Sequence, residues 1–322
     1  DTTLPVSGER LHEIITELFP IMRSITGPGV RESLHKLQQL APLVIHDIPS
    51  GSQVLDWTVP EEWHFTEAWI ENLNGQRLVD TADSNLHIVN FSMPVDGEFT
   101  LEELRPHLHT LPAQSTSIPY RTSYYAEQWG FCLAHQTLET MGPGPFRVRI
   151  DAERKPGVLN YGELYVPGES SREILVSTHI CHPQLANDNL SGMVLSAALA
   201  SWLGLSKPEL SWRFVFVPGT IGAISWLARN RSTLSRIAGG LVITGLGDES
   251  DFNWKQTREG TQWIDRLVTQ ALEETTPDKH HLLPFSPYGY DERQYCSPGF
   301  KLPVGRLSRA VHGTFPEYHT SE

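Results

Sequence analysis

The segment THICHPQLANDNLSG, residues 178–192, gathers side chains that commonly bind metal ions. His179 and His182 carry imidazoles, and Asp188 carries a carboxylate. Zinc accepts neutral imidazole and carboxylate as ligands, and a catalytic zinc site needs three protein ligands with one position left open. His179 and Asp188 could therefore supply two ligands. His182 could be a further ligand or a neighbour that orients one.

The same residues also have an ordinary structural interpretation. Asp188 or Asn187 would cap a helix that is expected to start near Asn189, since Asp and Asn favour the position before a helix. His179 would then be a hydrogen-bonded polar residue at the end of a strand. Residue types alone leave both interpretations open.

The elements around the segment indicate where it lies. The run REILVST, residues 172–178, is typical of a buried strand that ends at His179. From residue 146 onward, strands alternate with helices, which predicts βαβ units and a mostly parallel sheet covered on both faces. Because active sites in such sheets lie at the carboxyl ends of the strands, we expect His179 and Asp188 at that edge.

The first part of the chain has a different texture. Helical spacing over residues 8–42 predicts two helices, with Ser7 as the N-cap of the first. Short β-like runs and turn sequences fill residues 43–135, apart from a short helix expected within FTLEELRPHLHTL, residues 99–111. The expected domains are an α/β core formed by residues 1–42 and 136–322, and an inserted β-rich subdomain formed by residues 43–135.

Composition excludes some classes of partner. The formal charge of −13 argues against nucleic acid, because phosphate backbones require a basic face. The sequence has no apolar run of about 18 residues and no secretory signal, so we expect no membrane association. The three cysteines are widely spaced, which is typical of a reduced, cytoplasmic protein. A homo-oligomer is compatible with the sequence but is not required by it.

The run ANDNLSG, residues 186–192, resembles the Asn-Asp-Asn-x-Ser-Gly signature of the co-catalytic zinc aminopeptidases, a family with glutamate carboxypeptidase-like and bacterial leucyl aminopeptidase members. In that family the Asp bridges two zinc ions, one ligand His ends the preceding strand, and the last ligand His follows a Tyr. The resemblance implies zinc as the cofactor, with His179, Asp188 and His319 as ligands. It also implies a three-layer α/β/α core of the aminopeptidase-like (phosphorylase/hydrolase-like) type.

A second resemblance covers most of the chain. Its motifs are DWTVPEEW (56–63), IPYRTSYY (118–125), WGFCL (129–133), HICHPQLANDNLSG (179–192), PGTIGAI (218–224), GYDERQYCSPG (289–299) and FPEYHTS (315–321). Together they resemble the bacterial proteins labelled polysaccharide biosynthesis proteins with an aminopeptidase-like domain. Those proteins commonly continue into a small winged-helix domain, so the resemblance implies that such a domain is missing from this chain.

The aminopeptidase pattern is incomplete in this chain. The family carries a Glu-Glu pair, one general base and one zinc ligand, where this chain reads PGTIG, residues 218–222. A further family Asp ligand is expected where this chain reads TGLG, residues 244–247, ahead of Asp248 and Glu249. We therefore expect one zinc ion rather than two. One zinc ion is enough to lower the pKa of its bound water toward about 7.

The general base must then come from elsewhere in the chain. The best placed carboxylates are Glu292 and its neighbour Asp291 in GYDERQYCSPG, followed by Glu317 beside the last ligand. Arg293 could bind a substrate carboxylate or an oxyanion, and Tyr318 is expected to contact the substrate. As an ordinary alternative, the residues of the Asp-Glu-Arg run form a structural ion pair within a turn.

Two further groups of residues also have more than one interpretation. Cys181 is expected to be a small buried residue, although Cys181 and Cys296 could instead act together as thiolate ligands. The aromatic and basic run IPYRTSYYAEQWGFC, residues 118–132, could line a pocket for a polar substrate with an apolar face, or could simply connect the subdomain to the core.

These observations predict a zinc-dependent hydrolase of the aminopeptidase type. We expect it to cleave an amide bond, peptide or aminoacyl, in a small-molecule or short peptide substrate. One alternative is a zinc-dependent deacylase or esterase in polysaccharide or natural-product biosynthesis. Another is a catalytically inactive, aminopeptidase-like binding module, since both family glutamates are absent.

Overall fold

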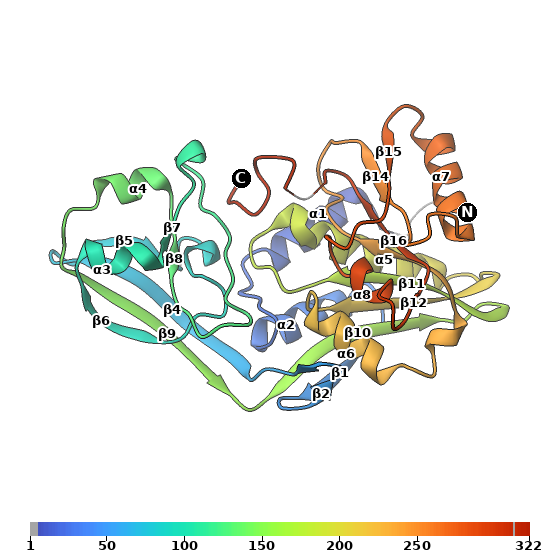
Figure 1. The fold of residues 1–322 in the computed structure, drawn as a ribbon, viewed down its shortest axis with the longest axis horizontal. Coiled ribbons are helices and arrows are strands. Elements are labelled where there is room, and N and C mark those ends of the chain that lie inside the picture. The colour runs from blue at the N-terminus through green and yellow to red at the C-terminus, as the bar shows by residue number, and fades with distance from the viewer. Residues whose placement is uncertain (1–5, 312) are drawn as a thin grey trace.

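The larger part of the molecule is built on an eight-stranded sheet with helices on both faces (Figure 1). The computed structural model describes residues 6–311 and 313–322. The strands lie in the order β1-β10-β12-β11-β13-β16-β14-β15, and the central neighbours β12, β11, β13 and β16 run parallel. Their bounds are β1 (Val44–Pro49), β10 (Val158–Val166), β11 (Ser170–His179), β12 (Leu210–Val217), β13 (Ile237–Ile243), β14 (Phe252–Lys255), β15 (His280–Leu283) and β16 (Val304–Ser308).

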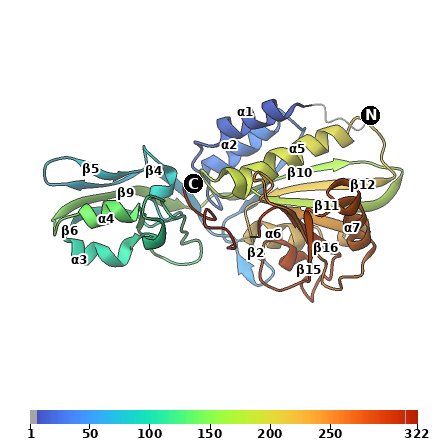
Figure 2. The ribbon, with the colours of Figure 1, turned by 90° about the horizontal axis from the view of Figure 1, so that it is seen from above.

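The central strand β11 is apolar because both of its faces are covered. Ile174 and Val176 pack in the core beneath α1, α2 and α5, whereas Leu175 packs in the core on the side of α6. Figure 2 shows these helices on opposite sides of the sheet. The predicted three-layer α/β/α core with a mostly parallel sheet is therefore confirmed. The helices of the core are α1 (Gly8–Leu18), α2 (Pro28–Leu37), α5 (Gly192–Leu203), α6 (Ile221–Arg229), α7 (Trp263–Thr275) and α8 (Glu292–Tyr295).

A smaller subdomain extends from one end of the core, and its two long strands, β4 and β9, pair with each other (Figure 1). Its sheet has the order β5-β4-β9-β6. Its remaining elements are two short α-helices, three single-turn 3-10 helices and a second pair of short strands. The bounds are β4 (Glu62–Asn72), β5 (Arg77–Asp80), β6 (Val95–Phe99), α3 (Leu101–Leu104), β7 (Leu108–His109), β8 (Phe131–Cys132), α4 (His135–Thr140) and β9 (Phe146–Lys155), while the hairpin β2 (Gln53–Val54) and β3 (Trp57–Thr58) precedes them.

Sheet membership differs from the expected domain boundaries at two strands. Strand β1 falls within residues 43–135 but pairs with β10 in the large sheet. Strand β9 falls within residues 136–322 but pairs with β4 and β6 in the small sheet. The sequence of β9 alternates apolar and charged residues, which suits a strand with one wet face better than a central strand covered on both faces.

The two predicted N-terminal helices are α1 and α2, and the Ser7 side chain accepts the N–H of Arg10 as the expected N-cap. The short helix predicted within residues 99–111 is α3, which begins with a capping box of Thr100 and Glu103. Among the residues that the structure describes, no helix is both long and apolar enough to cross a bilayer.

Candidate metal centre

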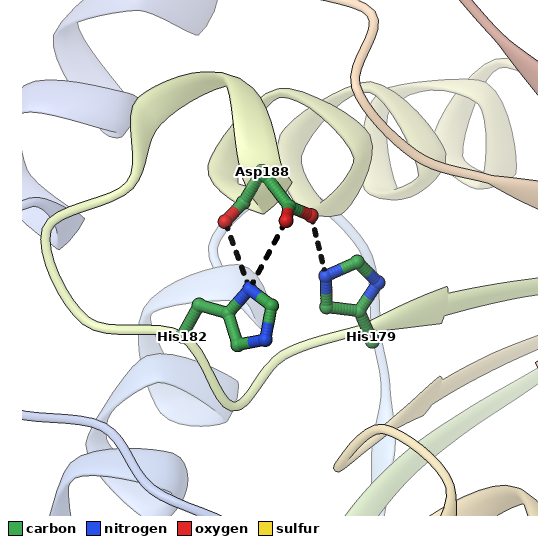
Figure 3. A group of neighbouring side chains, drawn as sticks. All are labelled: His179, His182 and Asp188. Carbon is green, nitrogen blue, oxygen red and sulfur yellow. Dashed lines mark hydrogen bonds and ion pairs between the residues drawn. The ribbon is translucent and has the colours of Figure 1, made fainter. Parts of the chain in front are cut away.

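Four side chains converge where β11 ends at the carboxyl edge of the sheet. His179 is the last residue of β11, and His182 lies in the loop that follows. Asp188 lies in the irregular turn before α5, between the rings of His179 and His182 (Figure 3). Its Oδ1 lies 2.8 Å from Nε2 of His179, and its Oδ2 lies 3.4 Å from Nδ1 of His182. The same Oδ2 lies 3.0 Å from Nε2 of His319, which comes from the C-terminal segment.

These side chains have the chemistry of a metal site. One ligand atom each from His179, His182 and Asp188 lie within 4.8 Å of one another, and His319 shares the carboxylate with them. Nε2 of His179 is buried close to an Asp188 oxygen, yet it makes no hydrogen bond of acceptable geometry. A buried polar atom without a hydrogen bond is costly, and a divalent ion between the two atoms would satisfy both. The donor set therefore fits a zinc ion.

His182 differs from the other two imidazoles in what its ring faces. Its Nδ1 lies 3.1 Å from the backbone carbonyl oxygen of Asp188, so an N–H there can donate to that oxygen and to the carboxylate. Burial lowers the pKa of His182, but the Asp188 carboxylate and the Cys181 thiol outweigh this effect and raise it well above its usual value. Burial lowers the pKa of both His179 and His319. The rings of His179 and His319 can therefore offer lone pairs, whereas Nδ1 of His182 faces the oxygens of Asp188.

Asn189 holds the strand end and the turn together. Its side-chain amide donates to Oγ1 of Thr178 at 2.7 Å and to the carbonyl oxygen of His179 at 3.0 Å. Its Oδ1 accepts the backbone N–H of Gly245 at 3.2 Å, and a Cβ at position 192 would lie only 2.3 Å from this oxygen. These contacts explain why the motif has Asn at 189 and Gly192, a structural role that the sequence analysis missed.

A cavity of about 200 Å³ opens beside these histidines. Tyr290 stacks on His179 with ring centroids 5.1 Å apart, and Tyr318 stacks on His319 at 3.9 Å. Aromatic rings therefore form much of its wall, and the run 118–132 contributes Tyr124 and Tyr125 to it. The lining residues are Tyr124, Tyr125, His179, Cys181, His182, Gly219, Thr220, Tyr288, Gly289, Tyr290, Asp291, Tyr318 and His319.

Asp291 is the predicted carboxylate that the structure brings to this cavity. Its side chain is buried, and Oδ1 accepts the backbone N–H of Thr220 at 2.7 Å, where α6 begins. Thr220 lies in the stretch where the aminopeptidase pattern carries its Glu pair, so Asp291 brings a carboxylate from a different loop to this stretch. Burial raises the pKa of Asp291 to about 7, although the N–H of Thr220 favours the charged form. A carboxylate of this pKa suits general-base catalysis at neutral pH.

Glu292, the first choice of base from the sequence, is placed away from the cavity. Its carboxylate is fully buried, 2.8 Å from Nζ of Lys255 and 3.7 Å from Nη1 of Arg306. Glu292 follows Asp291 directly at the start of α8, and adjacent helical residues do not face the same way. Once Asp291 points into the cavity, Glu292 points into the interior.

We expect Glu292→Gln to lower stability rather than to remove a catalytic group. The substitution removes the carboxylate charge that lies 2.8 Å from the buried Nζ of Lys255, and breaking a buried ion pair in this way costs about 3–5 kcal/mol. Urea unfolding measures the loss, and turnover per folded molecule should stay within about threefold of wild type. Unchanged stability together with lost turnover would return the role of base to Glu292.

The other predicted residues are divided between the site and the surface. Tyr318 lies at the cavity, whereas the side chains of Arg293 and Glu317 are exposed, and Arg293 does not line it. Cys181 is buried and lines the cavity. The Cys296 thiol instead donates to a backbone carbonyl oxygen in the interior at 2.9 Å, so the structure does not bring the two thiols together as ligands.

A second cavity, of about 480 Å³, lies on the other side of His319. Glu317 lines it, and the Asp248 carboxylate, held by the side-chain amide of Asn187 at 2.6 Å, lines it as well. The described residues around this cavity include four acidic side chains and no lysine or arginine. Its lining residues are Phe19, Gln184, Leu185, Ala186, Asn187, Asp188, Gly247, Asp248, Phe315, Glu317, Tyr318, His319, Thr320, Ser321 and Glu322.

Known structures share this architecture. A zinc aminopeptidase from Bacillus subtilis, BSAP, superposes with a TM-score of 0.66 at 13% identity, covering 99% of this chain and 90% of that one. An aminopeptidase from Aneurinibacillus sp. strain AM-1 gives a TM-score of 0.60 at 13% identity, over 98% and 88% of the two chains. At these identities the likeness shows the fold alone, which is aminopeptidase-like and related to that of zinc peptidases.

A more similar relative is a Clostridium acetobutylicum protein whose description assigns it provisionally to polysaccharide biosynthesis, with an aminopeptidase-like domain. It is 44% identical over 315 residues, which are 98% of this chain and 72% of the relative. A crystal structure from the same organism, described provisionally as a peptidase, has a TM-score of 0.95 at 44% identity, covering 98% of this chain and 74% of that one. The resemblance seen in the sequence motifs is thus confirmed. Residues 12–322 also match the model of a domain of unknown function, so the chain belongs to the DUF4910 family.

Proposed function

We propose that this protein is a zinc-dependent hydrolase of the aminopeptidase type that cleaves an amide bond in a small substrate. The observation that carries the proposal is the convergence of His179, Asp188 and His319 beside a cavity that also holds a buried carboxylate, Asp291. His179, Asp188 and His319 would hold one zinc ion, and Asp291 would act as general base. The aminopeptidase-like fold of relatives that include zinc enzymes supports the same conclusion.

The residues of the site have different roles in this reaction. A zinc ion held by His179, Asp188 and His319 would lower the pKa of a bound water toward about 7 and would polarise the scissile carbonyl. Asp291 accepts the proton that the attacking water loses and can return it to the leaving amine. His182 keeps the Asp188 carboxylate oriented through its Nδ1. Tyr290 and Tyr318, stacked on two of the imidazoles, keep bulk water from those faces.

The acidic cavity favours a substrate with a free amino group. Asp248 and Glu317 line it together with Asp188, and none of the described residues of its lining is a lysine or an arginine that could neutralise them. A cationic ammonium group is attracted to such a cavity, whereas a neutral acyl sugar gains little from it. This charge distribution supports an aminopeptidase over the deacylase and esterase alternatives.

Hydrolysis assays with matched substrates test the proposal. We expect an aminoacyl amide to be hydrolysed at least about tenfold faster than its N-acetylated analogue, because acetylation removes the ammonium charge. A chelator should stop the reaction and added zinc should restore it. Faster cleavage of an N-acetylated amino sugar or an ester would favour the deacylase or esterase. Bound zinc without turnover of any of these substrates would favour a binding module.

We expect His182→Ala to weaken zinc binding by roughly 10- to 100-fold without abolishing it, as is usual when a residue that orients a ligand is lost. His281→Ala is the matched control, because His281 is an exposed histidine that pairs with Asp251 at 3.1 Å, away from the site. Competition with a chromogenic chelator measures both dissociation constants. Complete loss of zinc in His182→Ala would instead make His182 a direct ligand.

A further inference from the structure

The C-terminal segment that carries His319 is held by the inserted subdomain. In Figures 1 and 2 this segment lies between the subdomain and the core. The backbone N–H of Tyr120 donates to the carbonyl oxygen of His319 at 2.7 Å, next to an antiparallel bridge between Pro119 and Thr320. No described residue of this segment belongs to a strand of the large sheet. The position of His319 therefore depends on contacts with the subdomain.

Further hydrogen bonds extend this contact on both sides of His319. Ser321 and Ile118 are joined twice, since the N–H of Ser321 donates to the carbonyl oxygen of Ile118 at 2.9 Å and the N–H of Ile118 donates to Oγ of Ser321 at 3.0 Å. Nε2 of Gln114 donates to the carbonyl oxygen of Pro316 at 2.8 Å. The segment is thus attached before and after the ligand.

The backbone of His319 requires such attachment. Its φ is 55°, in the left-handed region that residues with a side chain adopt at a cost. A conformation of this kind persists only when the surroundings fix it. The carbonyl oxygen of His319 itself accepts the hydrogen bond from the N–H of Tyr120. This bond therefore holds the strained residue directly.

The subdomain also holds the loop that carries His182. Oε1 of Gln184 accepts from Oγ of Ser84 at 2.8 Å and from the N–H of Asn85 at 2.6 Å. Leu185 packs in a small buried cluster with Leu86, and Tyr120 belongs to the same cluster. The Tyr120 ring makes T-shaped contacts with the rings of His182 and His319, with centroids 5.0 and 5.2 Å apart. One part of the subdomain thus touches both metal-binding segments.

We infer that residues 84–86 and 114–120, here called the clamp, are positioning residues that bring the two metal-binding segments together and so set the affinity for the metal. The inference rests on the proposed zinc function. None of these residues makes a hydrogen bond or ion pair with the Asp188 carboxylate. They would therefore act on the metal only by fixing the positions of His319 and of the loop at 182–188. Ligands held in place before the metal arrives lose less entropy when it binds.

The double variant Gln114→Ala/Ser321→Ala tests the clamp. It removes one side-chain hydrogen bond on each side of His319 and leaves every proposed ligand in place. We expect hydrogen exchange of the backbone amide at position 321, which donates to Ile118, to speed up at least about fivefold in the metal-free variant. We expect the zinc dissociation constant to rise roughly 10- to 100-fold.

Two comparisons separate this role from a general loss of stability. Thr100→Ala removes a helix cap elsewhere in the subdomain, and should leave exchange at position 321 and zinc affinity unchanged. Ser321→Thr as a single substitution keeps a hydroxyl that can accept the N–H of Ile118, and should leave both values close to those of the wild type. Thermal unfolding should change no more in the double variant than in Thr100→Ala.

The outcomes distinguish this inference from the proposed function. An unchanged zinc dissociation constant in the double variant overturns the inference, even if exchange becomes faster. If the wild-type protein takes up no zinc, the proposed function fails. In that case the rate of hydrogen exchange at position 321, compared between the metal-free double variant and the metal-free wild type, tests alone whether the clamp holds the C-terminal segment. An unchanged rate overturns the inference.

Discussion

Asp188→Asn should abolish zinc binding and lower kcat/KM for an aminoacyl amide by at least about 1,000-fold, since metal activation of water and carbonyl is worth several kcal/mol. The Asp188 carboxylate lies within reach of all three imidazoles, at 2.8 to 3.4 Å. An amide keeps the size of the side chain but removes its charge. Elemental analysis of the purified variant measures the metal content.

Asp248→Asn is the matched control for this variant. Asp248 is another carboxylate of the neighbouring cavity, but it is held by Asn187 and contacts none of the three imidazoles in the described contacts. The control should keep about one zinc ion per chain, as a single-zinc site requires. If Asp188→Asn kept its zinc, or if Asp248→Asn lost it, the ligand assignment would be wrong.

Asp291→Asn should lower kcat by about 100- to 10,000-fold while the zinc content stays that of the wild type, because a general base contributes that much to rate. The amide oxygen can still accept the N–H of Thr220, so the loop should keep its conformation. In the wild type, kcat/KM should rise with pH through about 7, where Asp291 loses its proton. Glu317→Gln, which removes an exposed carboxylate, should keep that profile.

The same variant should change the pH dependence of stability. The unfolded chain loses the Asp291 proton near pH 4, but the folded protein keeps it until about pH 7. The free energy of unfolding of the wild type therefore falls as the pH rises through this window, by at most about 4 kcal/mol, because the unfolded chain ionises Asp291 more easily than the folded protein does. Asp291→Asn should be the more stable protein above pH 7, by urea unfolding, and should lose this advantage near pH 4. Lost turnover without this difference would contradict the buried state of the carboxylate.

Local patterns predicted much of the fold. The apolar run before His179 specified a strand covered on both faces, and Ser7 and Thr100 marked two helix starts where the structure has them. The partner of β9 was not predictable in this way. A strand is recognised from its own residues, whereas its neighbour is decided by contacts between segments far apart in the chain.

The site shows the same division between local and long-range information. His179 and Asp188 lie in one strand-loop-helix unit, so their proximity followed from that unit. The resemblance alone suggested His319, and no local signal indicated that the subdomain would hold it. The choice between Asp291 and Glu292 depended on which side of one short helix faces the cavity, and no spacing rule decides this for a single turn.

Anomalous diffraction at the zinc edge, from crystals of the protein prepared with zinc, tests the central claim most directly. The account predicts one zinc ion with Nε2 of His179 and Nε2 of His319 each at about 2.0–2.1 Å and an Asp188 oxygen at about 2.0–2.2 Å. The absence of zinc from this position, or a bound zinc ion that His319 does not contact, would contradict it.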